Sequence, residues 1–315
     1  MSANTQELID FLAQVRRSVR QQRCAMDQAI NDFGAGASTD CLSAVDSDFL
    51  KAPGSRMLAQ RRLYQHGWMV AYLMATNIGD HLAAIADTAT PDEPRVFAHM
   101  TLARAALEGA ARVAYLLHPS GTLPDRLLRA AFVLLSSAEE ELNAVPDLAT
   151  FNLAMGEAAN ERATSRHKAI RHVLDESEIV VKHERRGGRR LHSVSWADSP
   201  DQEQEAPNVT RLLKQLLPKR PSAYNVGSGA VHSQPWVLDV DGAFDPQTRT
   251  LNCPFDPFAL ARSVDLAISA SILAMETFAE MLGQDPSHER TKAQRREMAV
   301  SLLAQSLLSV SEGNI

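Results

Sequence analysis

The sequence predicts an all-α protein, a multi-helix bundle with one or two short β-hairpin excursions. Its long segments repeat their apolar residues at the helical period of 3.6 residues, whereas runs of β-branched residues are brief. The composition agrees with helix, because 46 of the 315 residues are Ala and 36 are Leu, while Gly and Pro number only 15 each.

Three helices are expected in the first 117 residues. Apolar residues at helical spacing predict helices over about 5–33 and 55–88. Thr90-Pro91-Asp92-Glu93 then has the pattern of a capping box, in which the Thr hydroxyl accepts from exposed amides and the Glu reaches back. A third helix over 92–117 follows, and its small residues would let another helix approach closely.

Two more helices are expected next. The segment 122–125, with Pro124 in the first helical turn, opens a helix with a Leu-rich core face, and Pro146 is expected to end it. The following helix, about 147–176, carries few large apolar residues. We therefore expect it on the outside of the bundle.

The stretch from Ile179 to Trp196 has a different pattern. β-Branched residues flank Arg186-Gly187-Gly188-Arg189, whose two glycines suit a two-residue hairpin turn. The acidic segment 198–205 is expected to be a solvated linker. The sequence thus predicts one helical domain over 1–315 that carries a hairpin and acidic linker insertion at 179–206.

The C-terminal third returns mainly to helix. Asn208 can cap a short helix, and a further helical segment is expected over 221–233. A turn-rich stretch at 236–251, centred on Asp241-Gly242, is a candidate second hairpin. The last two helices are expected over two apolar stripes, at 258–282 and 298–308.

Charge and cysteine content exclude several classes of protein. The net charge of −6 provides no global basic field for nucleic acid or an anionic membrane. Three widely spaced cysteines without a CxxC pair are expected to be reduced thiols. Charged residues near the N-terminus exclude a secretory signal, so the protein is expected in the cytoplasm and not at a membrane. The excess of Arg over Lys suggests a bacterial source.

The first candidate site is a polar row on the helix 92–117. Arg104, Glu108 and Arg112 are spaced i, i+4, i+8, so they share one side of that helix. Two interpretations are open. The row is either an intrahelical ion-pair ladder on a partly wet face, or it lines a cleft in which the guanidinium groups hold a phosphate or carboxylate.

The second candidate site is a row with the same spacing, Tyr224, Ser228 and His232. If 221–233 is helical, three groups able to exchange protons line one face, next to Asn225. The glycines at 227 and 229 cost such a helix about 1 kcal/mol each. They fit either a close helix crossing with a hydrogen-bonded core His and Tyr, or a polar site shared with the helix 92–117.

Motifs for metals and nucleotides are absent from the sequence. No Glu-x-x-His or His-Glu-x-x-His pair occurs, and there is no Walker loop and no nucleophile elbow. We therefore predict neither a metal nor a cofactor. The basic run 182–190 carries five Lys or Arg and one Glu, and it is either a solvated hairpin tip or a handle for RNA or DNA.

A resemblance rests on Arg104-x-x-x-Glu108-x-x-x-Arg112, the Leu-Leu-His-Pro run at 116–119, and Tyr224-x-x-x-Ser228-x-x-x-His232. This combination resembles uncharacterised bacterial helical proteins near the HEPN superfamily. The resemblance implies a helical bundle, a possible homodimer, and a metal-independent ribonuclease of a toxin or defence system. His232 matches the family's histidine and Asn225 its polar residue, whereas Tyr224 stands where the family has Arg, and the nearest upstream Arg is Arg220.

Two functions are thus predicted. The first is a helical module that binds a small ligand or a partner at a polar site between the 92–117 and 221–233 helices. The alternative is a HEPN-like ribonuclease that acts on RNA, with His232 as general acid or base. The discriminating observation is whether Arg104 or Arg112 approaches His232 in an open cleft.

Overall fold

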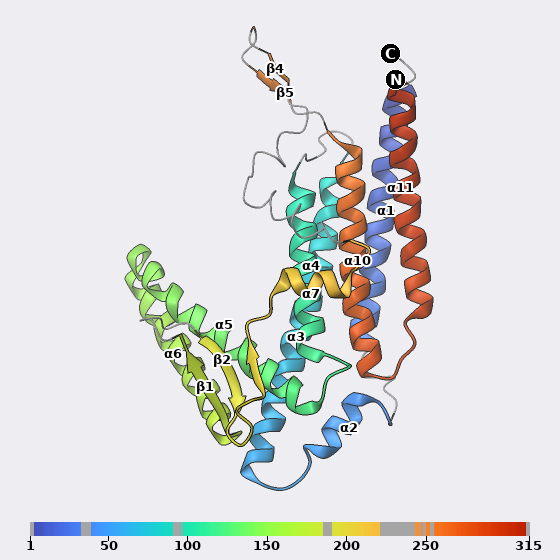
Figure 1. The fold of residues 1–315 in the computed structure, drawn as a ribbon. Helices are drawn as coiled ribbons and strands as arrows, with labels where there is room; N and C mark the ends of the chain where they lie inside the picture. The colour runs from blue at the N-terminus through green and yellow to red at the C-terminus, as the bar shows by residue number, and fades with distance from the viewer. Residues whose placement is uncertain are drawn as a thin grey trace.

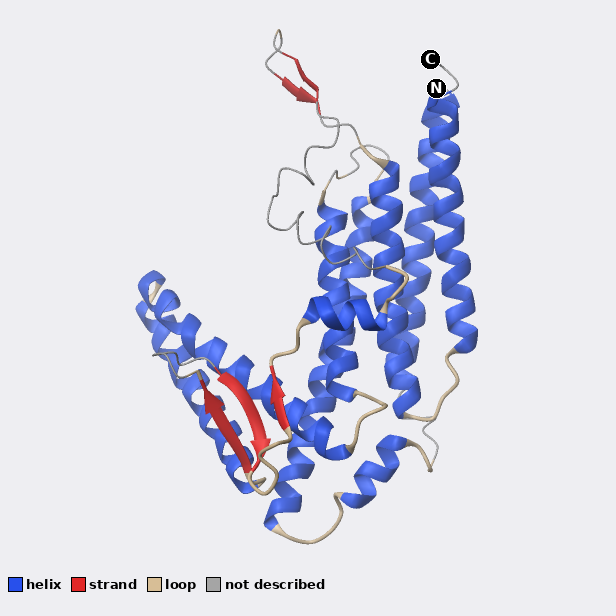
Figure 2. Cartoon of the chain, in the orientation of Figure 1, coloured by secondary structure: helices blue, strands red, loops and turns tan. Residues whose placement is uncertain are grey.

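The computed structural model describes residues 3–32, 39–90, 95, 97–184, 191–220, 243–245, 247, 250–252 and 255–312. The described residues form long helices with one three-stranded and one two-stranded antiparallel sheet, as Figure 1 and Figure 2 show. The predicted fold class, an all-α bundle with short hairpins, is therefore confirmed.

Five helices run side by side as an upright bundle (Figure 1). They are α1 (Ala3–Asp32), α3 (Ser55–Thr88), α4 (Ala98–Leu117), α10 (Pro257–Met281) and α11 (Ser287–Glu312). Helix α4 packs against both α3 and α10, and its buried face is rich in Ala, which lets the neighbouring helices approach closely. A Cβ built on Gly109 would lie only 3.1 Å from Ile78, which shows how close the α3 contact is.

Helix α10 lies in the core of this bundle. By length and composition it is the one helix in the described ranges that could cross a membrane, but 67% of its apolar window is buried inside the protein. Asp256 caps its first turn by accepting a hydrogen bond from the Phe258 amide at 2.8 Å. Its apolar surface therefore packs against α3, α4, α1 and α11.

A second group of elements, here called the arm, branches away from the bundle (Figure 1). It contains α5 (Leu123–Phe151), α6 (Leu153–Glu176) and the sheet of β1 (Ile179–His183), β2 (Leu191–Trp196) and β3 (Glu203–Glu205). The strands pair antiparallel in the order β1-β2-β3, and β2 and β3 lie against α5. Helix α7 (Val209–Leu216) then returns to the bundle and packs on α4.

A buried ion pair joins the start of α5, where the arm leaves the bundle, to a short helix that precedes α3. The short helix α2 (Leu42–Phe49) carries Asp46, which accepts two hydrogen bonds from Arg126 of α5, at 2.9 and 2.7 Å. Both side chains are almost fully buried. Arg126 also donates to the carbonyl oxygens of His118 and Gly121. One guanidinium thus joins α2, α5 and the loop after α4.

Several elements agree with the sequence predictions. The expected helices 5–33, 55–88 and 258–282 correspond to α1, α3 and α10, and the hairpin 179–196 corresponds to β1 and β2. The side chain of Asn208 caps α7 by accepting from the Arg211 amide at 2.9 Å. Helix α6 is mostly exposed, as its composition indicates.

Two helix boundaries were predicted wrongly. Helix α4 begins at Ala98, six residues later than predicted, and Arg95 before it is not helical; the capping-box residues 91–93 lie outside the described residues. Helix α5 continues through Pro146 to Phe151. Val145 packs against Ala159 and Ala163 of α6, and this contact carries α5 past the proline. The break comes at Asn152, which caps α6.

Three smaller expectations also differ from the structure. Helix α2 was missed because its eight residues are too few to show a repeating apolar stripe. The end of the acidic linker is not loop, since Glu203–Glu205 pairs with β2 as a third strand. The second hairpin exists, but it is formed by β4 (Ala243–Asp245) and β5 (Thr250–Asn252), so its turn lies after Asp245 rather than at Asp241-Gly242. Asp245-Pro246 is itself a turn-forming pair.

Candidate functional site

The polar row on α4 is divided between two environments. Arg104 Nη2 lies 2.8 Å from Glu108 Oε1, and both side chains are partly buried, so these two residues form an intrahelical ion pair. Arg112, one turn later, is exposed and makes no hydrogen bond or ion pair with any residue that the structure describes. The row is therefore not a continuous ladder, and Arg112 keeps a guanidinium available for other contacts.

The second predicted row cannot be compared with the first. Tyr224, Asn225, Ser228 and His232 lie outside the described residues. The expected meeting of His232 with Arg104 or Arg112 therefore stays a prediction.

Arg112 lines a cleft between the bundle and the arm. The cleft has a volume of about 710 Å³ and is formed by residues from six segments of the chain. One wall comes from α3, α4 and the start of α7, and the other from α5, α6 and β2. The two walls belong to the two groups of elements that diverge in Figure 1.

The floor of the cleft is apolar. It is formed by side chains of α3, α5, β2 and the loop before α7, namely Val70, Met74, Phe132, Val133, Leu134, Leu191, Pro207 and Val209. Helices α3 and α5 also pack into the core, where Ile78, Leu128 and Leu135 are almost fully buried. Removal of water from such a surface favours binding of an apolar body.

Both walls of the cleft carry charged side chains. Arg112 stands on the bundle wall, and Glu139 and Glu140 stand on the arm wall. The Glu139 carboxylate already has a partner, because its Oε1 lies 2.9 Å from His183 Nε2. Glu140 makes no ion pair within the described part of the chain. Arg166 also lines the cleft and contacts Glu141 at 3.0 Å.

No family model, curated protein or solved structure matches this chain. The candidate site therefore rests on its own geometry.

Tyr115 holds the cleft walls at a fixed spacing. Its hydroxyl donates to the carbonyl oxygen of Glu205 at 3.1 Å, which ties α4 to β3. Arg129 of α5 lies 4.8 Å above the Tyr115 ring and donates to the Tyr115 carbonyl oxygen. Burial raises the pKa of Tyr115 to about 12, so the hydroxyl remains a hydrogen-bond donor.

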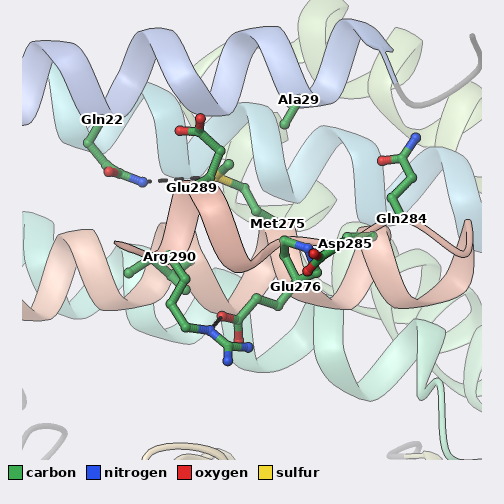
Figure 3. Close-up of a pocket in the computed structure, with 11 residues that line it drawn as sticks. Gln22, Ala29, Met275, Glu276, Gln284, Asp285, Glu289 and Arg290 are labelled. Carbon is green, nitrogen blue, oxygen red and sulfur yellow. Dashed lines mark hydrogen bonds and ion pairs between the residues drawn. The ribbon is translucent and has the colours of Figure 1, made fainter. Parts of the chain in front are cut away.

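A smaller hollow lies inside the bundle, between α1, α10 and the start of α11 (Figure 3). Its volume is about 110 Å³. Its polar groups are paired: Gln22 donates to Ser271 at 2.8 Å and accepts from Arg296 at 2.6 Å, and Arg290 pairs with Glu276. These contacts give the hollow a role in helix packing.

A second polar cluster joins α10, α11 and the turn that follows α7. Arg220 donates to both oxygens of Asp265, at 2.7 and 2.5 Å, and its Nη2 lies 3.5 Å from Glu297 Oε2. Ser269 donates to the other oxygen of Glu297 at 3.1 Å. Burial and the nearby Asp265 carboxylate raise the pKa of Glu297 to about 7.

Among the residues that line the cleft, Arg112 was predicted from the sequence, and the residues of the arm wall were not. Ser136, Glu140 and Asn143 recur at helical spacing on α5 and are the pattern that could have indicated this wall. Among the described residues, no three His, Cys, Asp or Glu side chains lie close enough together to hold a metal ion.

Proposed function

We propose that this protein is a helical ligand-binding module whose ligand is a small amphipathic anion held in the cleft between bundle and arm. The observation that carries the proposal is the Arg112 guanidinium, which has no partner in the described chain and stands beside an apolar floor. An unpaired guanidinium favours a carboxylate, sulfonate or phosphate, which it can bind through two hydrogen bonds.

The size and lining of the cleft support a small-molecule ligand. Its volume of about 710 Å³ lies within the range of roughly 300–1,000 Å³ that is usual for ligand sites. Such sites combine a mainly apolar lining with a few polar groups that fix the orientation. Here Arg112, Ser136, Ser137 and Asn143 supply polar groups, beside the charged side chains of Glu139, Glu140 and Arg166.

The charges predict the orientation of the ligand. Its anionic group would face Arg112 on the bundle wall, away from the unpaired carboxylate of Glu140 on the arm wall. Its apolar body would lie on the floor near Val70 and Met74, which are partly exposed. Replacing Glu140 with Gln should strengthen binding of an anion a few-fold, because it removes a like charge from the cleft.

A pair of fluorescent probes tests this proposal. Anilinonaphthalene sulfonate and N-phenyl-naphthylamine share their aromatic rings, and only the first carries a sulfonate. Arg112→Gln should weaken binding of the sulfonate probe roughly tenfold and leave binding of the uncharged probe unchanged. Arg17→Gln on α1, also an exposed arginine, is the matched control and should change neither affinity.

Two results would contradict the proposal. If Arg112→Gln leaves the affinity for the sulfonate probe unchanged, Arg112 does not hold the anion. If Arg17→Gln weakens binding as much as Arg112→Gln does, the effect reflects net charge and not a site.

The ribonuclease alternative remains a prediction from the sequence resemblance. Its residues His232, Tyr224, Ser228 and Asn225 lie outside the described residues, and Arg220, the nearest upstream arginine, is engaged with Asp265. Incubation of the protein with labelled single-stranded RNA tests it. Cleavage that is lost in His232→Ala and retained in Arg112→Gln would favour the nuclease over the binding module.

A further inference from the structure

The outer face of α3 exposes large apolar side chains. Met69, Tyr72 and Leu73 are each more than 40% exposed, and they lie within one helical turn of one another. Single exposed apolar residues are common on protein surfaces, whereas neighbouring ones on one helix face form an apolar patch that a partner can cover. We call these three residues the α3 patch.

A groove runs beside the α3 patch. It has a volume of about 300 Å³ and lies between α3 and α6, with a lining that includes Leu63, Ile170 and Val173. Met69 and Leu73 also line it. The surface therefore offers both projecting apolar side chains and a hollow that can receive apolar side chains.

Charged residues flank the α3 patch symmetrically. Arg62 lies nine residues before Ala71, and Asp80 lies nine residues after it, while Met69 and Leu73 lie two residues before and after it. Arg62 and Asp80 are thus 18 residues apart, which is five helical turns, so they share one side of α3 about 27 Å apart.

Both charges are available to a partner. Arg62 is exposed and forms no ion pair with the residues described in the structure. The Asp80 side chain is 68% exposed, and its contact with Arg23 of α1 is long, at 3.8 Å. An ion pair of this length and exposure contributes little, so it can be exchanged for a better one.

We propose that the α3 patch binds a second copy of this chain, with the two α3 helices antiparallel and crossing near Ala71. In this register Arg62 faces Asp80 of the partner subunit, and the reciprocal pair forms at the other end. The Met69 and Leu73 side chains meet the same patch of the partner subunit and enter its groove.

Self-complementarity is the reason for choosing a second copy. A two-fold dimer brings the same surface of both subunits together. Each cation on that surface must therefore face an anion of the other subunit. The α3 face meets this condition with one cation, one anion and an apolar centre between them. The evidence for the dimer is separate from that for the ligand, because none of the three α3 patch residues lines the cleft; the groove and the cleft are neighbours that share Val70, Leu134 and Arg166.

Sedimentation equilibrium of the full chain over a concentration series tests the proposal. Arg62→Asp and Asp80→Arg should each weaken the dimer roughly tenfold, because each substitution places like charges opposite each other twice. The double variant Arg62→Asp/Asp80→Arg should restore the affinity of the original chain, because it exchanges the charges within both pairs.

Leu73→Glu tests the apolar centre and should weaken the dimer roughly a hundredfold. Leu302→Glu on α11 is its matched control, because Leu302 is 58% exposed and Leu73 is 57% exposed. Circular dichroism confirms that each variant is folded, and Tyr72→Ser replaces Leu73→Glu if the latter does not fold.

Four results would overturn the proposal. The original chain could be monomeric at every concentration, or the dimer could persist in Leu73→Glu and Tyr72→Ser. Leu302→Glu could dissociate it equally, which would place the interface elsewhere. Failure of the double charge exchange to restore association would exclude the antiparallel register.

Discussion

Replacing Asp46 with Ala should lower the free energy of unfolding by about 3–5 kcal/mol. The carboxylate accepts two hydrogen bonds from Arg126, and both side chains are almost fully buried. Its removal leaves the buried Arg126 guanidinium without its counter-charge. A buried charge without a partner destabilises the folded state strongly. Urea denaturation followed by circular dichroism measures the change.

Asp48→Ala is the matched control on the same short helix. Asp48 pairs with Lys51, but both side chains are about 70% exposed, so the loss should be well below about 1 kcal/mol. The double variant Asp46→Leu/Arg126→Met should be less destabilised than Asp46→Ala, because it leaves no buried charge. Equal effects of Asp46→Ala and Asp48→Ala would show that the buried pair does not lock α2 to α5.

Glu297→Gln should remove a pH dependence of stability. Burial and Asp265 raise the pKa of Glu297 to about 7, whereas the ordinary value is 4.5. Between these two pH values the folded state holds a proton that the unfolded state has released. The contribution of Glu297 to the stability of the original chain should therefore fall as pH rises from about 4.5 to about 7, and it should then level off.

The comparison of the two chains isolates this contribution. Relative to the original chain, Glu297→Gln should gain roughly 3 kcal/mol of unfolding free energy between about pH 4 and about pH 8. Glu280→Gln on the exposed side of α10 is the control, and its difference from the original chain should not change with pH in this way. A constant difference for Glu297→Gln would mean that Glu297 ionises normally in the folded protein.

Periodicity was enough to predict the long helices. The apolar stripes of α1, α3 and α10 are long and regular, and these helices appear at the predicted positions. Boundaries failed where a tertiary contact outweighed a local preference. The packing of Val145 on α6 carries α5 through Pro146, and no property of the residues around 146 alone indicates that contact.

The candidate site was less accessible from the sequence. The spacing of Arg104, Glu108 and Arg112 was visible, and the structure pairs the first two while leaving Arg112 at the cleft. The cleft itself brings together segments from Val70 to Val209, and their meeting depends on the direction in which the arm leaves the bundle. Helical periodicity carries no information about that direction.

Methionine methyl NMR shows whether an amphipathic anion binds in the cleft. Met74 lines the cleft, whereas Met298 is 63% exposed on α11 and lies outside it. With methyl-labelled methionine, and with Met74→Leu and Met298→Leu to assign the two resonances, the anilinonaphthalene sulfonate probe should shift the Met74 methyl signal and leave that of Met298 in place. A saturating titration that shifts Met298 and leaves Met74 unchanged would contradict the account.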